Sequence, residues 1–184
     1  MVFRLLLLFS IAFSSYGAEV AGVNVPDSDQ QLSLNGAGLR KRAFFQVYVI
    51  ALYLPAKKTV AAEAIAATGP KRIAIHMLRD VDADQLSGAL ADGIKDNHGE
   101  SELKALEPRV KQLSAIMGEM KEAKKGMRIT LDWQPAAGTQ VSVEGKPTGA
   151  AIPGEDFYRA LLRIWLGDKP VQDDLKRALL GEKP

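Results

Sequence analysis

Alternating and continuous apolar positions predict the β-strands of this chain. Residues 44–54 are almost continuously apolar and rich in Phe, Val, Tyr and Ile, which is typical of a strand buried on both faces. In residues 72–77 and 127–134, apolar side chains alternate with polar ones, so we expect one covered face and one wetter face. No apolar stretch after residue 18 has the length that a transmembrane helix needs.

Two turn motifs predict where further strands end. Short strands in residues 23–34 are expected to end at Asn35-Gly36, a pair that favours tight turns. Residues 141–143 alternate again and precede Glu144-Gly145-Lys146, an order that predicts a hairpin.

Apolar residues that recur every three or four positions predict four helices. These helices cover residues 82–97, 103–120, 157–165 and 171–179. The first begins with Asp82-Ala83-Asp84-Gln85, which has the form of a capping box. Pro108 interrupts the second, so we expect a break near Glu107. Pro170 is expected in the first turn of the last helix.

Widely spaced strands, with helices between them and gathered at the C-terminal end, predict the fold class. The pattern indicates an α+β domain, in which an antiparallel β-sheet carries a layer of helices packed on one face. The chain has 184 residues and 47% of them are hydrophobic, which suits one globular domain. No internal repeat or linker divides it.

Residues 1–18 have the order of a secretory signal peptide. Arg4 precedes an apolar stretch that ends at Phe13, and the small-residue run Ser14–Ala18 follows it. The apolar core is about half as long as a bilayer-spanning helix. We therefore expect cleavage near Gly17 or Ala18, a mature domain over residues 19–184, a periplasmic or secreted location, and no stable membrane insertion after cleavage.

Composition excludes several kinds of chemistry. The 24 Lys and Arg residues nearly balance 22 Asp and Glu residues, so charge gives no reason to expect a nucleic-acid partner. Cysteine is absent, which removes thiol catalysis, Cys-based metal sites and disulfides. His76 and His98 do not form a pair at metal-ligand spacing, and no phosphate-binding loop or serine-hydrolase motif occurs. We expect neither a metal nor a cofactor.

Arg40 is the most informative charged residue. It precedes the most apolar segment of the chain, where an arginine either extends to the surface or is buried opposite an anion. Spacing alone favours the surface, since Lys41 and Arg42 beside it agree with an exposed basic edge.

Two motifs resemble the chalcone isomerase-like family. The first is Leu34-Asn35-Gly36-Ala37-Gly38-Leu39-Arg40 followed by the apolar segment up to Pro55, and the second is Ala151-Ile152-Pro153-Gly154 followed by residues 165–171. The resemblance extends from about residue 20 to the C-terminus and is greater to the exported bacterial branch than to the plant enzymes. It implies an open-faced sandwich with a ligand cleft between sheet and helices.

The resemblance also implies a ligand site. In this fold the arginine at the position of Arg40 faces the cleft, where it assists a phenolate in plant isomerases and holds a carboxylate in fatty-acid-binding relatives. Tyr48 matches the fatty-acid-binding branch, whereas the isomerase has a threonine there. Residues 82–89 contain neither the tyrosine nor the asparagine of the isomerase, and Tyr158 replaces a small polar residue on the penultimate helix. Arg40, Tyr48 and Tyr158 are the predicted ligand-binding residues, and no residue is assigned a catalytic role.

The sequence is compatible with three functions. The missing isomerase residues favour a non-catalytic protein that binds a small amphipathic, fatty-acid-like carboxylate. An isomerase or intramolecular lyase of unknown substrate is the second possibility, and it depends on Arg40 and the fold alone. The third is an interaction module of the cell envelope whose cleft is filled by its own side chains. The sequence indicates neither the oligomeric state nor the ligand.

Overall fold

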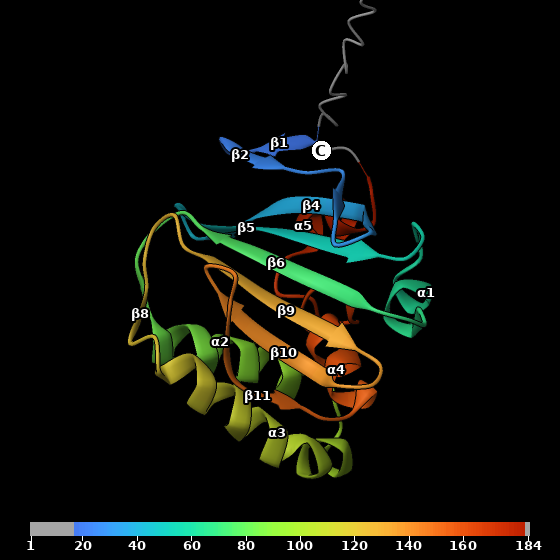
Figure 1. Cartoon of the computed structure of the whole chain (residues 1–184), viewed down its shortest axis with the longest axis vertical. Helices are drawn as coiled ribbons and strands as arrows, with labels where there is room; N and C mark the ends of the chain where they lie inside the picture. The colour runs from blue at the N-terminus through green and yellow to red at the C-terminus, as the bar shows by residue number, and fades with distance from the viewer. Residues whose placement is uncertain (1–16, 183–184) are drawn as a thin grey trace, which may run out of the picture.

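A seven-stranded antiparallel sheet forms the centre of the molecule (Figure 1). The computed structural model describes residues 17–182. The strands lie in the order β11-β10-β9-β6-β5-β4-β3. Their bounds are β3 (Ser28–Asp29), β4 (Leu32–Arg42), β5 (Phe45–Leu54), β6 (Lys71–Met77), β9 (Arg128–Gln134), β10 (Gly138–Val143) and β11 (Lys146–Ile152).

The helices cover one face of this sheet, as the sequence pattern predicts. Within residues 17–182 they are α1 (Ala61–Ala66), α2 (Ala83–Asp96), α3 (Glu100–Gly118), α4 (Glu155–Leu166) and α5 (Asp173–Leu179). Their apolar side chains meet those of β5, β6 and β9 in one core. Helix α4 contributes three of the largest buried side chains, Phe157, Tyr158 and Trp165. The fold class is therefore the predicted α+β, with an antiparallel sheet and helices on one face.

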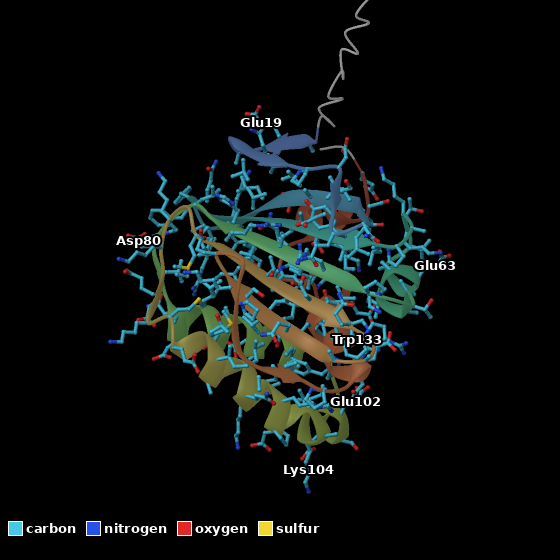
Figure 2. The ribbon with its side chains drawn as sticks, in the orientation of Figure 1. Glu19, Glu63, Asp80, Glu102, Lys104 and Trp133 are labelled. Atoms are coloured by element: carbon cyan, nitrogen blue, oxygen red, sulfur yellow. The ribbon has the colours of Figure 1, made fainter. Side chains whose placement is uncertain are left out.

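A short hairpin covers part of the other face. Strands β1 (Ala18–Val20) and β2 (Val23–Val25) pair with each other and contribute to a second, smaller core that includes Val49 and Tyr53 of β5. Strand β5 is thus buried on both faces from Tyr48 to Leu54, as its apolar composition predicts. The prediction is wrong for Phe44 and Phe45, which are exposed because they project beyond the sheet at the β4–β5 turn. A third small sheet pairs β7 (Val81–Asp82) with β8 (Glu122–Ala123). In Figure 2, Glu63 of α1 and Asp80 after β6 label opposite sides of the molecule.

The predicted turn at Asn35-Gly36 is wrong, because β4 continues through both residues. The β4–β5 register shifts between Leu34 and Gly36, but the strand does not end there. Asn35 is buried, and its side-chain nitrogen donates to the carbonyl oxygens of Leu179 at 2.7 Å and Lys58 at 2.9 Å. The bond to Leu179 anchors α5 on the sheet, and the bond to Lys58 holds the segment between β5 and α1. A local turn motif carries no information about these distant contacts.

Two predictions about helices also need correction. Helix α3 continues past Pro108 without a break. Pro108 lies on the exposed side of α3, where water can hydrate the carbonyl that loses its partner. Pro170 precedes α5 instead of lying in its first turn. The capping of α2 is confirmed, since Asp82 accepts hydrogen bonds from the backbone of Asp84 and Gln85.

The predicted hairpin at Glu144-Gly145 is confirmed between β10 and β11, with both turn residues at positive φ. The predicted signal peptide falls almost wholly on residues 1–16, which lie outside the described residues, and it stays a prediction. Among residues 17–182, no helix is long and apolar enough to cross a membrane.

Candidate functional site

Arg40 and Tyr48 are neighbours across the β4–β5 ladder. They are register partners, and Tyr48 points into the core between sheet and helices. Trp165 of α4 donates from its indole Nε1 to the Tyr48 hydroxyl at 3.1 Å. Tyr48 and Trp165 are buried, at 6% and 1% exposure, whereas Arg40 is partly exposed. The three side chains define the candidate site, which begins at the sheet edge and ends inside the apolar core.

Gln172, just before α5, closes the outer end of this site. Its Oε1 accepts from Arg40 Nη1 at 3.2 Å and from the Lys41 backbone nitrogen at 2.8 Å. Its Nε2 donates to the Leu39 carbonyl at 2.9 Å. Arg40 Nη1 also donates to the Lys41 carbonyl at 2.6 Å. Gln172 therefore holds the start of α5 against β4 and occupies the Nη1 edge of the Arg40 guanidinium.

Arg40 has only neutral hydrogen-bond acceptors, unlike two more deeply buried cations. Arg72 of β6 meets Asp132 at 2.5 Å and Asp29 at 2.6 Å, and the Lys71 ammonium lies 2.9 Å from Glu155. Within residues 17–182, no carboxylate oxygen lies within 4.0 Å of the Arg40 guanidinium. A partly buried guanidinium with neutral neighbours is suited to bind an anion.

The Tyr48 hydroxyl is a neutral hydrogen-bonding group. Burial raises the pKa of Tyr48 above its ordinary value of 10.0, and the Trp165 hydrogen bond and the Arg40 charge only partly oppose that rise. The phenol therefore keeps its proton near pH 7. Because its oxygen accepts from Trp165, its own proton can be donated to a second group.

The structure does not bring Tyr158 together with the other two predicted residues. Its hydroxyl donates to the Leu131 carbonyl of β9 at 2.9 Å, and its ring lies 6.2 Å from that of Trp133. By strand register, Leu131 is two strands across and four residues along from Tyr48, or roughly 10 Å by about 13 Å. Tyr158 joins α4 to β9, and its role toward a ligand stays a prediction.

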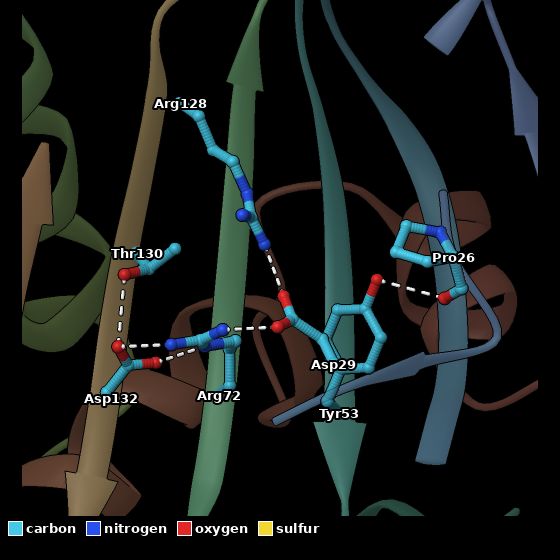
Figure 3. A network of polar contacts seen from close by, with 7 residues as sticks. All are labelled: Pro26, Asp29, Tyr53, Arg72, Arg128, Thr130 and Asp132. Carbon is cyan, nitrogen blue, oxygen red and sulfur yellow. Dashed lines mark hydrogen bonds and ion pairs between the residues drawn. The ribbon is translucent and has the colours of Figure 1, made fainter. Parts of the chain in front are cut away.

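A charged network lies on the opposite face of the sheet (Figure 3). Arg72 binds both carboxylate oxygens of Asp132, at 2.5 Å and 2.8 Å, and donates to Asp29, which also pairs with Arg128. Tyr53 donates to the Pro26 carbonyl at 3.1 Å. Burial is the main cause that raises the pKa of Tyr53 to about 12. Through this network, Asp29 of β3 is held against Arg72 of β6 and Arg128 of β9.

Sequence reasoning missed this network, because it took the polar positions of both strands as a wetter face. A cavity of about 330 Å³ adjoins the network, between β2–β3 and the sheet. Two others, of about 590 Å³ and 700 Å³, lie between α2 and α3 and beside α1. These three cavities of the described region are lined by none of Arg40, Tyr48 and Tyr158.

The histidines lie apart from the Arg40 site. His76 is on β6 and lines the cavity next to Arg128, whereas His98 Nδ1 lies 2.7 Å from the Ile94 carbonyl oxygen. In the described part of the chain, no three His, Cys, Asp or Glu side chains gather as metal ligands would.

The protein has an α+β fold, and Arg40 and Tyr48 lie side by side at the boundary between its sheet and its helices. Residues 17–181 match the family model described as chalcone isomerase-like, and the chain belongs to that family. Among solved structures it is similar to a fatty-acid binding protein from Arabidopsis thaliana, with a TM-score of 0.68 and 16% identity over 86% of this chain and 92% of that chain. This likeness shows the common fold. No curated protein sequence matches the chain.

Proposed function

We propose that this protein binds a small amphipathic carboxylate of the fatty-acid type at Arg40, without catalysing a reaction. The observation that carries the proposal is the Arg40 guanidinium, which has only neutral acceptors in the described structure and lies beside a buried phenol. An arginine grips a carboxylate with two parallel charge-assisted hydrogen bonds. The similar Arabidopsis structure is that of a fatty-acid binding protein, which supports the same ligand class.

The proposed binding position requires side chains to move. The carboxylate replaces the Gln172 amide at Arg40, and Tyr48 donates a further hydrogen bond to it. The hydrocarbon chain then extends between β5 and α4, where the Tyr48–Trp165 hydrogen bond now closes the core. Gln172 is therefore an internal competitor of the ligand.

The residues around Arg40 support binding more than catalysis. The isomerase-type tyrosine and asparagine are absent from residues 82–89, where α2 begins. Tyr48 is the titratable partner of Arg40 here, and its raised pKa makes it a poor general base at neutral pH. Arg40, Tyr48 and Gln172 are therefore suited to hold and orient an anion, and none of these three side chains is suited to remove a proton from it.

We propose that the mature protein is located in the periplasm or the extracellular space. The sequence order of residues 1–18 supports export followed by cleavage near Gly17 or Ala18. Cleavage after Gly17 would leave β1 whole, and cleavage after Ala18 would remove its first residue. Intact-mass measurement of the mature protein distinguishes these two positions from an uncleaved chain.

The ligand is tested first by organic extraction of the purified protein and mass spectrometry, and then by titration with a fluorescent fatty acid. Arg40→Ala is expected to weaken binding by about tenfold or more, since a hydrogen bond to a charged group contributes about 1.5–3 kcal/mol. Arg42→Ala, an exposed arginine on the same strand, is the matched control. Equal affinity of Arg40→Ala and the control contradicts the proposal. No extracted lipid and no binding by the unmodified chain would favour the envelope interaction module.

A further inference from the structure

Two adjacent phenylalanines project from the connection between β4 and β5. Phe44 is fully exposed and Phe45 is 58% exposed. The one other large apolar side chain of residues 17–182 that is markedly exposed is Val60, beside α1. Ala43 has a φ of 52°, so Phe44 lies at the tip of a tight two-residue turn. Two neighbouring aromatic side chains that project from a turn are typical of a site that contacts another apolar surface.

Cationic side chains surround these rings. Lys41 and Arg42 precede the turn and are exposed. Arg79, also exposed, places its guanidinium carbon 4.5 Å from the centre of the Phe45 ring. We call Lys41, Arg42, Phe44, Phe45 and Arg79 the basic aromatic tip.

More charged residues lie at the same end of the sheet. Exposed Lys124 and Lys125 lie in the segment that leads to β9, and this segment contacts the end of β6 through Gly126 and Met77. Asp80, labelled at this side in Figure 2, accepts from the Lys125 backbone nitrogen at 2.7 Å. Asp174 also lies near the tip, since its pKa is lowered by a hydrogen bond from Gln172 and also by the charge of Lys41. These two acids face five basic side chains, those of Lys41, Arg42, Arg79, Lys124 and Lys125.

We propose that the basic aromatic tip docks this protein reversibly on an anionic lipid surface. Aromatic rings favour the headgroup region of a bilayer, and each nearby lysine or arginine adds attraction to anionic lipids. The shape favours lipid over a protein partner, because a narrow convex tip can enter a headgroup layer without a groove to receive it. This is peripheral contact and agrees with the absence of a membrane-spanning helix in residues 17–182.

The docking surface lies next to the proposed ligand site. Arg40 is adjacent to Lys41 on β4, and its Nη1 donates to the Lys41 carbonyl. A docked molecule would therefore present the outer end of the ligand site to the lipid from which a fatty acid could enter. This link to ligand exchange rests on the proposed function, whereas docking itself does not.

Sedimentation of the mature chain with lipid vesicles tests docking. We expect binding to phosphatidylcholine vesicles that contain phosphatidylglycerol, weak binding to phosphatidylcholine alone, and loss of binding near 1 M salt, where the Debye length is about 3 Å. Phe44→Ser is expected to weaken binding by about tenfold. Lys41→Gln with Arg42→Gln is expected to weaken it by more than tenfold and to remove the preference for anionic vesicles. Val60→Ser removes an exposed apolar side chain near α1 and is the matched control.

Several results overturn the proposal. These are absence of binding by the unmodified chain, Phe44→Ser binding as well as Val60→Ser, or an unmodified dimer that Phe44→Ser converts to a monomer. The last result would make the tip a contact between two copies of this chain. Failure of docking is distinguishable from failure of the proposed function, because fatty-acid titration of Phe44→Ser without vesicles should match the unmodified protein. Arg40→Ala should likewise keep its binding to vesicles.

Discussion

At the scale of single residues, the surroundings of the partly exposed Arg40 distinguish it from the buried cations Arg72 and Lys71. Arg72 and Lys71 have carboxylate partners, and removal of such a partner would leave an uncompensated buried charge. Arg40 instead shares the Gln172 amide with the Lys41 backbone. A neutral amide satisfies geometry but does not neutralise charge, so a carboxylate is a better partner for Arg40 than Gln172.

Gln172→Ala is therefore expected to bind fatty acid more tightly than the unmodified protein. The substitution removes the hydrogen bond from the charged Arg40 to the Gln172 amide, which competes with the ligand. A hydrogen bond to a charged group contributes about 1.5–3 kcal/mol, so the affinity is expected to rise by about tenfold or more. Titration with the same fluorescent fatty acid measures the effect. Gln112→Ala is the control, because Gln112 contacts the Ala150 carbonyl far from Arg40. Weaker binding by Gln172→Ala would show that Gln172 supports the ligand instead of competing with it.

The candidate site was predictable only where its residues lie close together in sequence. Arg40 and Tyr48 are members of one motif, so a family resemblance identifies both. Trp165 and Gln172 are 117 and 132 positions away from the groups that they contact. Nothing in a single sequence pairs an indole or an amide with a partner at that separation, since those contacts depend on how α4 and α5 pack on the sheet.

At the scale of elements, the two glycines of β4 determine how α5 packs. A Cβ atom on Gly36 would collide with the carbonyl oxygen of Ala178, and one on Gly38 would come within 2.7 Å of the Leu175 side chain. The missing side chains therefore allow α5 to approach the sheet closely. This contact places Gln172, which precedes α5, against Arg40.

Gly36→Ala is expected to lower the free energy of unfolding by about 1–3 kcal/mol, because the added methyl group pushes α5 away from β4. Gly88→Ala is the control, since a Cβ at Gly88 in α2 meets no atom within 4 Å. The control is expected to stabilise the protein by about 0.5–1 kcal/mol. Urea denaturation of both variants and of the unmodified protein measures the difference. If Gly36→Ala is as stable as the unmodified protein, the packing of α5 does not depend on its close contact with Gly36.

Strands and helices with regular apolar spacing were predictable as elements, because their periodicity records which face is buried. The segments over β9 and α2 follow this rule. Strand β6 does not, because the expected wetter face is buried except at His76. Asn35-Gly36 and Pro108 misled the sequence reasoning for the opposite reason. Each has a local preference that a tertiary contact or an exposed helix face overrides.

At the scale of the whole molecule, ion pairs connect parts of the chain that the sequence could not join. Arg72 bridges positions 43 and 60 residues away on the face opposite the helices. On the helical face, the start of α4 is tied to β6 by Glu155–Lys71 and to α3 by Asp156–Arg109. The overall α+β arrangement was predictable from element order, but these long-range clamps were not.

The two α4 clamps predict how stability depends on pH. The hydrogen bond from Lys71 lowers the pKa of Glu155 below its ordinary value of 4.5, and that from Arg109 lowers the pKa of Asp156 below 3.8. A carboxylate with a lowered pKa in the folded state binds fewer protons there than in the unfolded state. Its stabilisation is present above the ordinary value and is lost as pH falls through the lowered one.

The melting temperature should therefore fall as pH decreases below about 4.5. In Asp156→Asn that decrease should be smaller, because one of the two titrating groups is gone. Asp168→Asn, an exposed acid after α4 without a salt bridge in the described structure, is the control. Thermal denaturation between pH 7 and pH 3 measures all three proteins. If Asp156→Asn keeps the full decrease, the ion pair between Arg109 and Asp156 does not contribute to the pH dependence of stability.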